Sequence, residues 1–331
     1  MFNEVITNSS ILANRYIIRE GYVFTSITHP SNIYDAIVIN NVSVQKGLFQ
    51  GFPKSEATLD EHIEYINKHH IEKALVYVDD LEFLKRTNTL KFLHIVLNND
   101  KFVMDYTPLY ELSEVKSLVV RREDFQEIPV PIDYSKVKGI EELYISGKGH
   151  INYEKLDTIK SLYCSNYKKK DLKGLFSSKI LDSLSLVQCS LENLEGLTNT
   201  ENLRCLYLGY NKRLYDINEL EGVKDTLTVL RIENCSKIQD FSVLNKLEKL
   251  QLLELTGRNS IEDLSFIKHM KNLKTFVFSM QVLDGDLSPC LDLSYVYSEK
   301  NRKHYKLSDK DMPKKEYVKG NDDIELWRRW E

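Results

Sequence analysis

The feature that most constrains this chain is an internal repeat of the form Leu-x-x-Leu-x-Leu, with apolar substitutions, which recurs from about residue 90 onward. The middle apolar residue of the successive copies is Leu93, Leu118, Leu143, Leu162, Leu184, Leu206, Leu230, Leu253 and Phe276. The copies lie 19 to 25 residues apart, and such a period predicts a stack of similar units. No single unit can bury its own leucines, so neighbouring units must share a continuous core.

Two further signals accompany the repeat. A small or polar residue follows several predicted strands, namely Asn98, Cys189, Asn211 and Cys235. The second half of the unit is also patterned, as in Ile238-Gln239-Asp240-Phe241-Ser242 and Ile261-Glu262-Asp263-Leu264-Ser265. Over roughly residues 71–297 these features resemble the leucine-rich repeat family, and in particular bacterial internalin-type repeats. The resemblance implies an α/β solenoid shaped as a horseshoe, with a parallel β-sheet on its concave face and short helices or turns on its convex face.

The same patterns predict three regions. Residues 71–297 are expected to hold about nine to eleven repeats, with a last strand near 291–296. Residues 1–70 are expected to form an N-terminal α+β cap, with strands near 16–18, 22–24, 36–39 and 42–44 and a helix from Thr58 to about Lys73. Residues 298–331 form a charged C-terminal cap or tail, in which Trp327 and Trp330 are predicted to cover the last repeat.

Composition narrows the class of partner and the compartment. The chain carries 45 basic and 49 acidic residues, so no overall field favours nucleic acid or a membrane surface. Basic runs such as Lys168-Lys169-Lys170 are interpreted as solvated faces. The N-terminus shows no secretion signal, no apolar run approaches about 18 residues, and the five cysteines form no CxxC motif. The prediction is a cytoplasmic protein with reduced thiols.

Few residues are of a type and spacing that could support catalysis, phosphate binding or metal binding, and they are isolated from one another. Gly147-Lys148-Gly149-His150 lacks the rest of a phosphate-binding motif and is predicted to be a turn. The adjacent pairs His69-His70 and Asp79-Asp80 diverge on any regular backbone, which disfavours joint metal binding. Cys205 is expected on an exposed column as an ordinary thiol. We therefore expect no catalytic residue, metal or cofactor in the repeats.

The concave face is the predicted binding surface. Within each strand the residue between the two core leucines is expected to point to solvent. Tyrosine and arginine dominate interface energetics. The predicted partner-binding residues are Arg121, Tyr144, Tyr163, Tyr207, Arg231, Glu233 and Glu254.

These observations predict a non-enzymatic module that binds a partner protein on its concave face. By analogy, it could be a bacterial immunity protein that occludes a toxin's active site. One alternative is an enzyme whose site lies in the N-terminal region, among His29, Asp60, His62, His69 and His70. Another is a structural adaptor that bridges two proteins through both of its faces.

Overall fold

The chain forms two compact units, one made mainly of residues 1–159 and the other of residues 160–324. The computed structural model describes residues 16–25, 35–40, 55–78, 80–97, 105–122, 128, 130–175 and 177–317. The predicted strand at 42–44, together with His29, Asp79, Asn98 and both tryptophans, lies outside the described residues. Each unit is considered by itself below.

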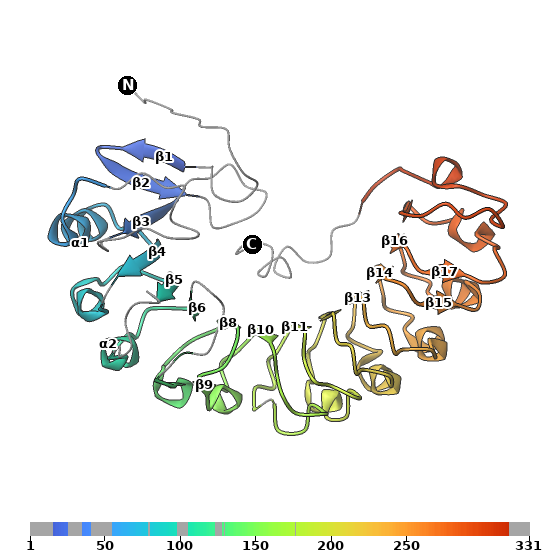
Figure 1. Ribbon diagram of the computed structural model, residues 1–331, viewed down its shortest axis with the longest axis horizontal. Coiled ribbons are helices and arrows are strands. Elements are labelled where there is room, and N and C mark those ends of the chain that lie inside the picture. Colours follow the sequence, from blue (N-terminus) through green and yellow to red (C-terminus); the bar gives the residue numbers. More distant parts are fainter. Residues whose placement is uncertain are drawn as a thin grey trace. The chain divides into compact units, whose positions relative to one another are not determined.

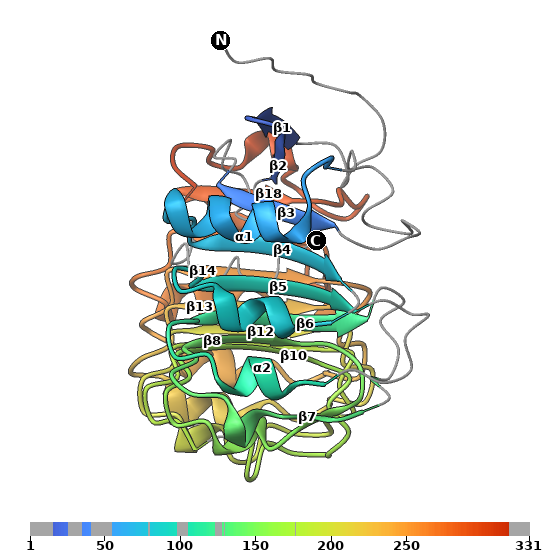
Figure 2. The same ribbon diagram turned by 90° about the vertical axis from the view of Figure 1, so that its left-hand side faces the viewer.

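Among the described residues, the first unit contains seven neighbouring sheet strands in the order β1-β2-β3-β4-β5-β6-β8. The strands are Tyr16–Arg19, Tyr22–Thr25, Ala36–Asn40, Lys73–Val78, Phe92–Leu97, Ser117–Arg122 and Glu142–Ile145. The first three pair antiparallel, and from β3 onward every pair is parallel. Figure 2 shows β4, β5 and β6 running side by side, with helices α1 and α2 in front of them.

Short elements complete the first unit. Its helices are α1 (Leu59–Lys68), η2 (Glu82–Arg86), α2 (Thr107–Tyr110), η3 (Tyr134–Lys136) and η4 (Tyr153–Lys155), and β7 (Ile132–Asp133) pairs with β9 (His150–Ile151). The helix predicted from Thr58 is confirmed, including its reciprocal cap: Glu61 accepts the Thr58 N–H at 2.7 Å, and Thr58 Oγ1 accepts the Glu61 N–H. It ends at Lys68, earlier than expected, because the chain turns through His70 at φ 52° and enters β4 at Lys73.

The second unit contains seven strands that are all parallel, in the order β10-β11-β12-β13-β14-β16-β18. They are Ser161–Ser165, Ser183–Val187, Cys205–Gly209, Val229–Glu233, Leu252–Thr256, Thr275–Phe278 and Tyr295–Ser298. The return segments carry η5 (Leu197–Asn199), η6 (Asn218–Val223), η7 (Ser242–Lys246), η8 (Ser265–His269), η9 (Ser288–Cys290) and η10 (Asp309–Asp311), with a two-residue pair, β15 (Ser260–Ile261) and β17 (Gln281–Val282). Within this unit the strands line the inside of the bend and the short helices line its outside (Figure 1).

The leucine repeat forms the core of the second unit as predicted. The strand register aligns Leu184, Leu206, Leu230, Leu253 and Phe276 in one row, and each of these side chains is fully buried. The predicted turn residue Asn211 links two repeats, because its Oδ1 accepts the Cys189 N–H at 2.7 Å and its Nδ2 donates to the Leu186 carbonyl at 2.9 Å. These features define a leucine-rich-repeat fold.

The aspartates of the return segments start the short helices. Asp240 accepts the N–H of Ser242 at 2.8 Å, and Asp263 accepts the N–H of Ser265 at 2.7 Å. Hydrogen bonds from the backbone and side chain of Ser242 lower the pKa of Asp240, and those from the side chain and backbone of Ser265 lower the pKa of Asp263. An aspartate that bonds the backbone two residues on forms a local turn, which explains why the Asp-x-Ser pattern recurs.

The last strand of the second unit begins at Tyr295, four residues after the predicted start. Its edge is covered by the following segment, which bridges it antiparallel at Tyr295 and Lys314. The Val296 N–H donates to the Pro313 carbonyl at 2.9 Å, and the Lys315 N–H donates to the Ser294 carbonyl at 3.0 Å. An uncovered strand edge would be a template for aggregation, so this segment protects the end of the stack.

Candidate functional site

The strand register of the second unit places five of the seven predicted binding residues on one face of the sheet. We call this the concave face; it is the face opposite the leucine core. One column across the strands reads Tyr163, Ser185, Tyr207, Arg231, Glu254, Val277 and Tyr297. A second column reads Ser165, Val187, Gly209, Glu233 and Thr256. In the first column the small Ser185 lies between Tyr163 and Tyr207.

The expected solvent exposure of this column is wrong over its first four positions. The exposed fraction is 8% for Tyr163, 4% for Ser185, 4% for Tyr207 and 4% for Arg231. Exposure rises along the column, and Tyr297 is 42% exposed. Parallel strands lie about 4.8 Å apart, so large neighbouring side chains cover one another. The residues at the beginning of the column therefore form a packed layer, and the accessible part of the face lies toward β14, β16 and β18.

Cys205 is also buried, although it was expected to be exposed. It packs against Val229 and Leu252, its partners in the next two strands, in a small apolar cluster on the concave face. Burial raises the pKa of other thiols in this unit, to about 11 for Cys189 and about 12 for Cys235. A thiol held in its protonated form is a poor nucleophile.

Glu233 is the centre of a tyrosine cluster on this face. The Tyr207 hydroxyl donates to Glu233 Oε2 at 2.7 Å, and the Tyr210 hydroxyl donates to Oε1 at 2.6 Å. Burial, followed by the bond to Glu233, raises the pKa of Tyr207. Gly209 makes this arrangement possible, because a Cβ there would lie 2.6 Å from the Tyr207 hydroxyl. Both oxygens of the carboxylate are thereby fixed.

Arg231 lies between Tyr207 and Glu254 in the first column. Its Nε stands 3.7 Å from Glu254 Oε2, which is an ion pair beyond hydrogen-bond distance. Its Nε and Nη1 are buried and have no hydrogen-bond partner among the described residues. Leaving such a donor unsatisfied costs about 1–3 kcal/mol. The buried guanidinium of Arg231 therefore keeps two nitrogen donors, Nε and Nη1, that make no hydrogen bond to the described residues.

Sequence reasoning missed Tyr210. It follows the end of β12 at φ 55°, and it is 40% exposed. The equivalent turn positions are Asn166, Gln188, Asn234 and Gly257. Asparagine and glycine tolerate the left-handed region, whereas a bulky residue there is an outlier. The signal available in the sequence was this contrast in residue type at one repeat position.

The other two predicted residues, Arg121 and Tyr144, belong to the first unit. Tyr144 is half-buried, and Arg121 is 4% exposed. The Arg121 Nε donates to His94 Nε2 at 3.1 Å. Burial, with the adjacent charge of Arg121, holds the pKa of His94 well below its usual range. The pair therefore consists of a neutral imidazole and a buried guanidinium.

The glycine-rich segment of the first unit forms a turn, as predicted. Gly147 and Gly149 have φ values of 89° and 90°, and a Cβ at Gly149 would lie 2.6 Å from the Ile128 carbonyl oxygen. The Tyr134 hydroxyl lies 2.9 Å from His150 Nδ1, while His150 Nε2 lies 3.2 Å from the Ser146 carbonyl. Burial lowers the pKa of His150 to about 4. Both ring nitrogens of His150 therefore lie within hydrogen-bond distance of groups of the protein itself.

Three of the described members of the N-terminal candidate group, His62, His69 and Asp60, each make separate local contacts. His62 is buried on α1, with its Nδ1 2.8 Å from the Thr58 carbonyl, and His69 stacks on Tyr65. Asp60 instead pairs with Arg86 at 2.6 Å. Among the described residues, no group of three His, Cys, Asp or Glu side chains could hold a metal ion.

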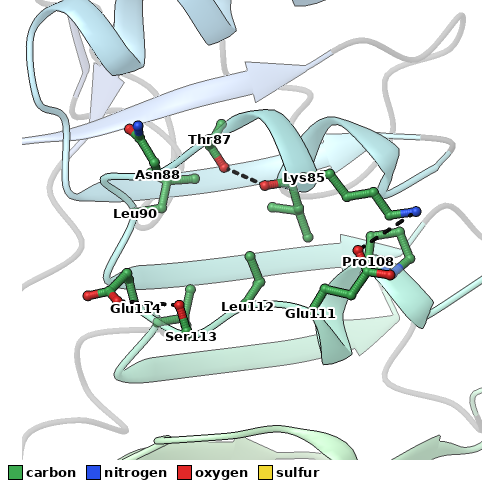
Figure 3. A pocket seen from close by; sticks show the side chains of 11 residues that line it. Lys85, Thr87, Asn88, Leu90, Pro108, Glu111, Leu112, Ser113 and Glu114 are labelled. Carbon is green, nitrogen blue, oxygen red and sulfur yellow. Dashed lines mark hydrogen bonds and ion pairs between the residues drawn. The ribbon is translucent and has the colours of Figure 1, made fainter.

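A cleft of about 230 Å³ lies between η2 and α2 of the first unit (Figure 3). Its lining includes Leu84, Leu90, Pro108 and Leu112. Lys85 and Glu111 approach each other to 4.0 Å across it. Ligand pockets typically have volumes of about 300–1,000 Å³, so this cleft is small for one.

Comparisons with known proteins find only partial similarities to this chain. No family model matches the chain. The disease resistance protein RRS1 of Arabidopsis thaliana is 29% identical over 100 residues, which are 30% of this chain. That stretch is 7% of the plant protein, so the chain spans less than a tenth of the curated relatives it matches.

Two solved structures are similar at low sequence identity. An internalin, inlF, from Listeria monocytogenes has 16% identity and a TM-score of 0.44, over 82% of this chain and 93% of that chain. A TLR13–ssRNA13 complex has 14% identity and a TM-score of 0.38, over 72% and 44%. In the part of the chain that the structure describes, no helix has the length and apolar character to span a membrane.

Proposed function

We propose that this protein is a non-enzymatic module that binds a partner protein on the concave face of its second unit. The observation that carries the proposal is the preorganised cluster in which Glu233 holds Tyr207 and Tyr210, beside the buried Arg231. Tyrosine and arginine are the side chains most enriched at energetically important contacts. Fixed side chains also lose little entropy on binding.

The accessible part of the contact surface follows from the exposure pattern. Glu254 is half-buried, and Tyr210 and Tyr297 are exposed. Tyr163 and Tyr207 form the packed layer beneath, where they support the surface residues. Surface residues are therefore the ones to substitute in a binding test, because truncating a buried tyrosine would also destabilise the sheet.

The test is affinity capture of the partner from native cells, followed by calorimetry with the purified pair. Glu254→Lys and Tyr297→Ala should each weaken binding about tenfold or more, with unchanged circular dichroism. The matched control is Glu195→Ala, whose side chain pairs with Lys173 on the return segments. If Glu195→Ala disrupts binding and the two concave changes do not, the partner uses the other face.

The finer role we propose is that of a cytoplasmic inhibitor or immunity protein in a bacterium. All five cysteines are buried free thiols, which supports a reducing compartment. A gene for a toxin domain beside this one, and inhibition of that toxin by the purified protein, would support the role. A ternary complex with two proteins, one on each face, would instead support the adaptor alternative.

A further inference from the structure

In the second unit, the edge at which the parallel strands β10 to β13 end is a regular row. Residues Asn166, Gln188, Tyr210 and Asn234 each follow a strand, at φ values of 52–62°. Each donates its N–H to a carbonyl at the end of the next strand, at 2.7–3.0 Å. Because the backbone of every turn is fixed by its neighbour, the side chains that follow project from a rigid edge.

This edge is strongly basic. The turns 166–170, 188–190, 210–213, 234–237 and 257–259 contain no acidic residue. They contain seven basic residues, all exposed: Lys168, Lys169, Lys170, Lys212, Arg213, Lys237 and Arg258. Lys170 pairs with Glu192 at 3.1 Å, and among the described residues it alone of the seven has an ion-pair partner. The chain as a whole, by contrast, has 49 acidic and 45 basic residues.

An aromatic side chain stands in the middle of the row. Tyr210 stands two residues before Lys212 in the same turn and is 40% exposed. Its hydroxyl donates a hydrogen bond to Glu233. Strained backbone persists where the surrounding structure enforces it, and such positions cluster at binding sites. The strain at Tyr210 is an observation independent of the charge row, and it points to the same edge.

We propose that this basic edge receives an acidic peptide segment of the partner protein, with Tyr210 as its aromatic anchor. This inference rests on the proposed function. Five strands about 4.8 Å apart give an edge of about 19 Å, which matches about six residues of extended peptide. Carboxylates spaced along such a peptide would pair with the lysines and arginines in turn.

Charge complementarity favours a peptide over a nucleic acid. Glu233 and Glu254 lie on the concave face next to the edge, and the chain as a whole carries a net charge of −4. A uniformly charged phosphate backbone would meet these carboxylates as well as the cations. A peptide can place acidic residues on the edge and uncharged or basic residues toward Glu233 and Glu254.

Fluorescence anisotropy tests the proposal with three labelled probes. The probes are a peptide of about 12 residues that repeats Glu-Ser-Gly, the same peptide with Gln in place of Glu, and a uridylate RNA of about 12 nucleotides. At about 150 mM salt, where weak electrostatic binding is screened, the Glu peptide should bind at least about tenfold more tightly than either other probe. Equal or tighter binding of the RNA, or no preference for Glu over Gln, would overturn the proposal.

Matched charge reversals locate the binding. Lys212→Glu with Arg213→Glu should weaken Glu-peptide binding about tenfold or more. Lys246→Glu with Lys268→Glu alters net charge equally on η7 and η8 and should change binding less than about twofold. Equal losses in both variants would show a non-specific charge effect and reject the edge.

The captured partner separates this inference from the proposed function. If Glu254→Lys weakens partner binding and Lys212→Glu with Arg213→Glu does not, the edge assignment fails while the concave-face module stands. If neither change affects the partner, both fail. If both weaken it and the Glu peptide competes with the partner, both are supported.

Discussion

Tyr207 and Glu233 stand one repeat apart and are joined by a 2.7 Å hydrogen bond from the Tyr207 hydroxyl to the Glu233 carboxylate. We expect Tyr207→Phe to reduce the free energy of unfolding by about 1.5–3 kcal/mol, the range for a hydrogen bond to a charged group. Urea denaturation of Tyr207→Phe, Glu233→Gln and the double variant should give a coupling energy above about 0.5 kcal/mol. Tyr297→Phe, on the exposed end of the column, is the control; equal losses at both tyrosines would contradict the assignment.

Tyr210→Gly should cost little stability, because glycine adopts the left-handed conformation freely while the side-chain bond to Glu233 is lost. We expect the free energy of unfolding to change by less than about 1 kcal/mol, since relief of strain offsets the lost bond. Binding of the Glu peptide should nevertheless fall. A large loss of stability with unchanged binding would show that Tyr210 serves the fold instead.

Leu206→Ala and Leu230→Ala remove fully buried side chains from the middle of the core row. Each should cost about 2–5 kcal/mol in chemical denaturation, whereas Ser185→Ala on the other face should cost less than about 0.5 kcal/mol. Similar losses at all three positions are incompatible with this register.

His150 predicts a pH dependence of stability in the first unit. Its pKa is lowered from 6.5 to about 4, so the unfolded chain binds the extra proton between these values. This contribution to stability is therefore fully present well above pH 6.5 and is lost as the pH falls toward 4, by about 2.5 kcal/mol at pH 4.5. His150→Gln should flatten this part of the unfolding profile of the full chain. An unchanged slope between pH 7 and pH 4.5 would assign the loss to other groups.

A chain that ends at Ser298 loses the segment that pairs with the edge of β18. We expect this truncation to aggregate, because the N–H of Val296 and the carbonyl of Ser294 lose their partners on that edge. A chain that ends at Tyr317 keeps these bonds and should remain as soluble as the full chain. Light scattering distinguishes the two, and a soluble, unchanged protein ending at Ser298 would contradict the role of this segment.

The sequence predicted the strands of the repeats because their leucine spacing is a direct consequence of burial on one face. It also predicted a polar residue at Asn211 after its strand, and the cap of α1 at Thr58, which depends on local hydrogen-bond geometry. The bonds by which Asn211 links two repeats reach 22 and 25 residues along the chain and appear only in the structure. The start of the last strand was misplaced because Leu291 and Leu293 continue the apolar pattern while the chain is still leaving η9. Where β4 begins is set by pairing with β3, which no local pattern reveals.

The candidate site was less accessible to sequence reasoning. Alternation identified which residues lie opposite the core, and the register then brought Tyr207, Arg231 and Glu254 together. The predicted solvent exposure of the first column was wrong because exposure depends on how far each side chain extends over the neighbouring strands. Tyr207 reaches across Gly209 to Glu233, and only coordinates show this. Tyr210 was missed because it lies just after the strand. A tyrosine is unusual there only because φ is positive, and the sign of φ is known from the structure.

The buried thiols turn the second unit into its own unfolding reporter. Cys164, Cys189, Cys205, Cys235 and Cys290 are distributed from β10 to η9, and burial raises the pKa of Cys290 to about 12. An alkylating reagent at neutral pH should modify each thiol only when its own repeat opens. Mass spectrometry of peptides would give the order in which the five thiols become labelled. That order would show in which sequence the repeats unfold along the stack.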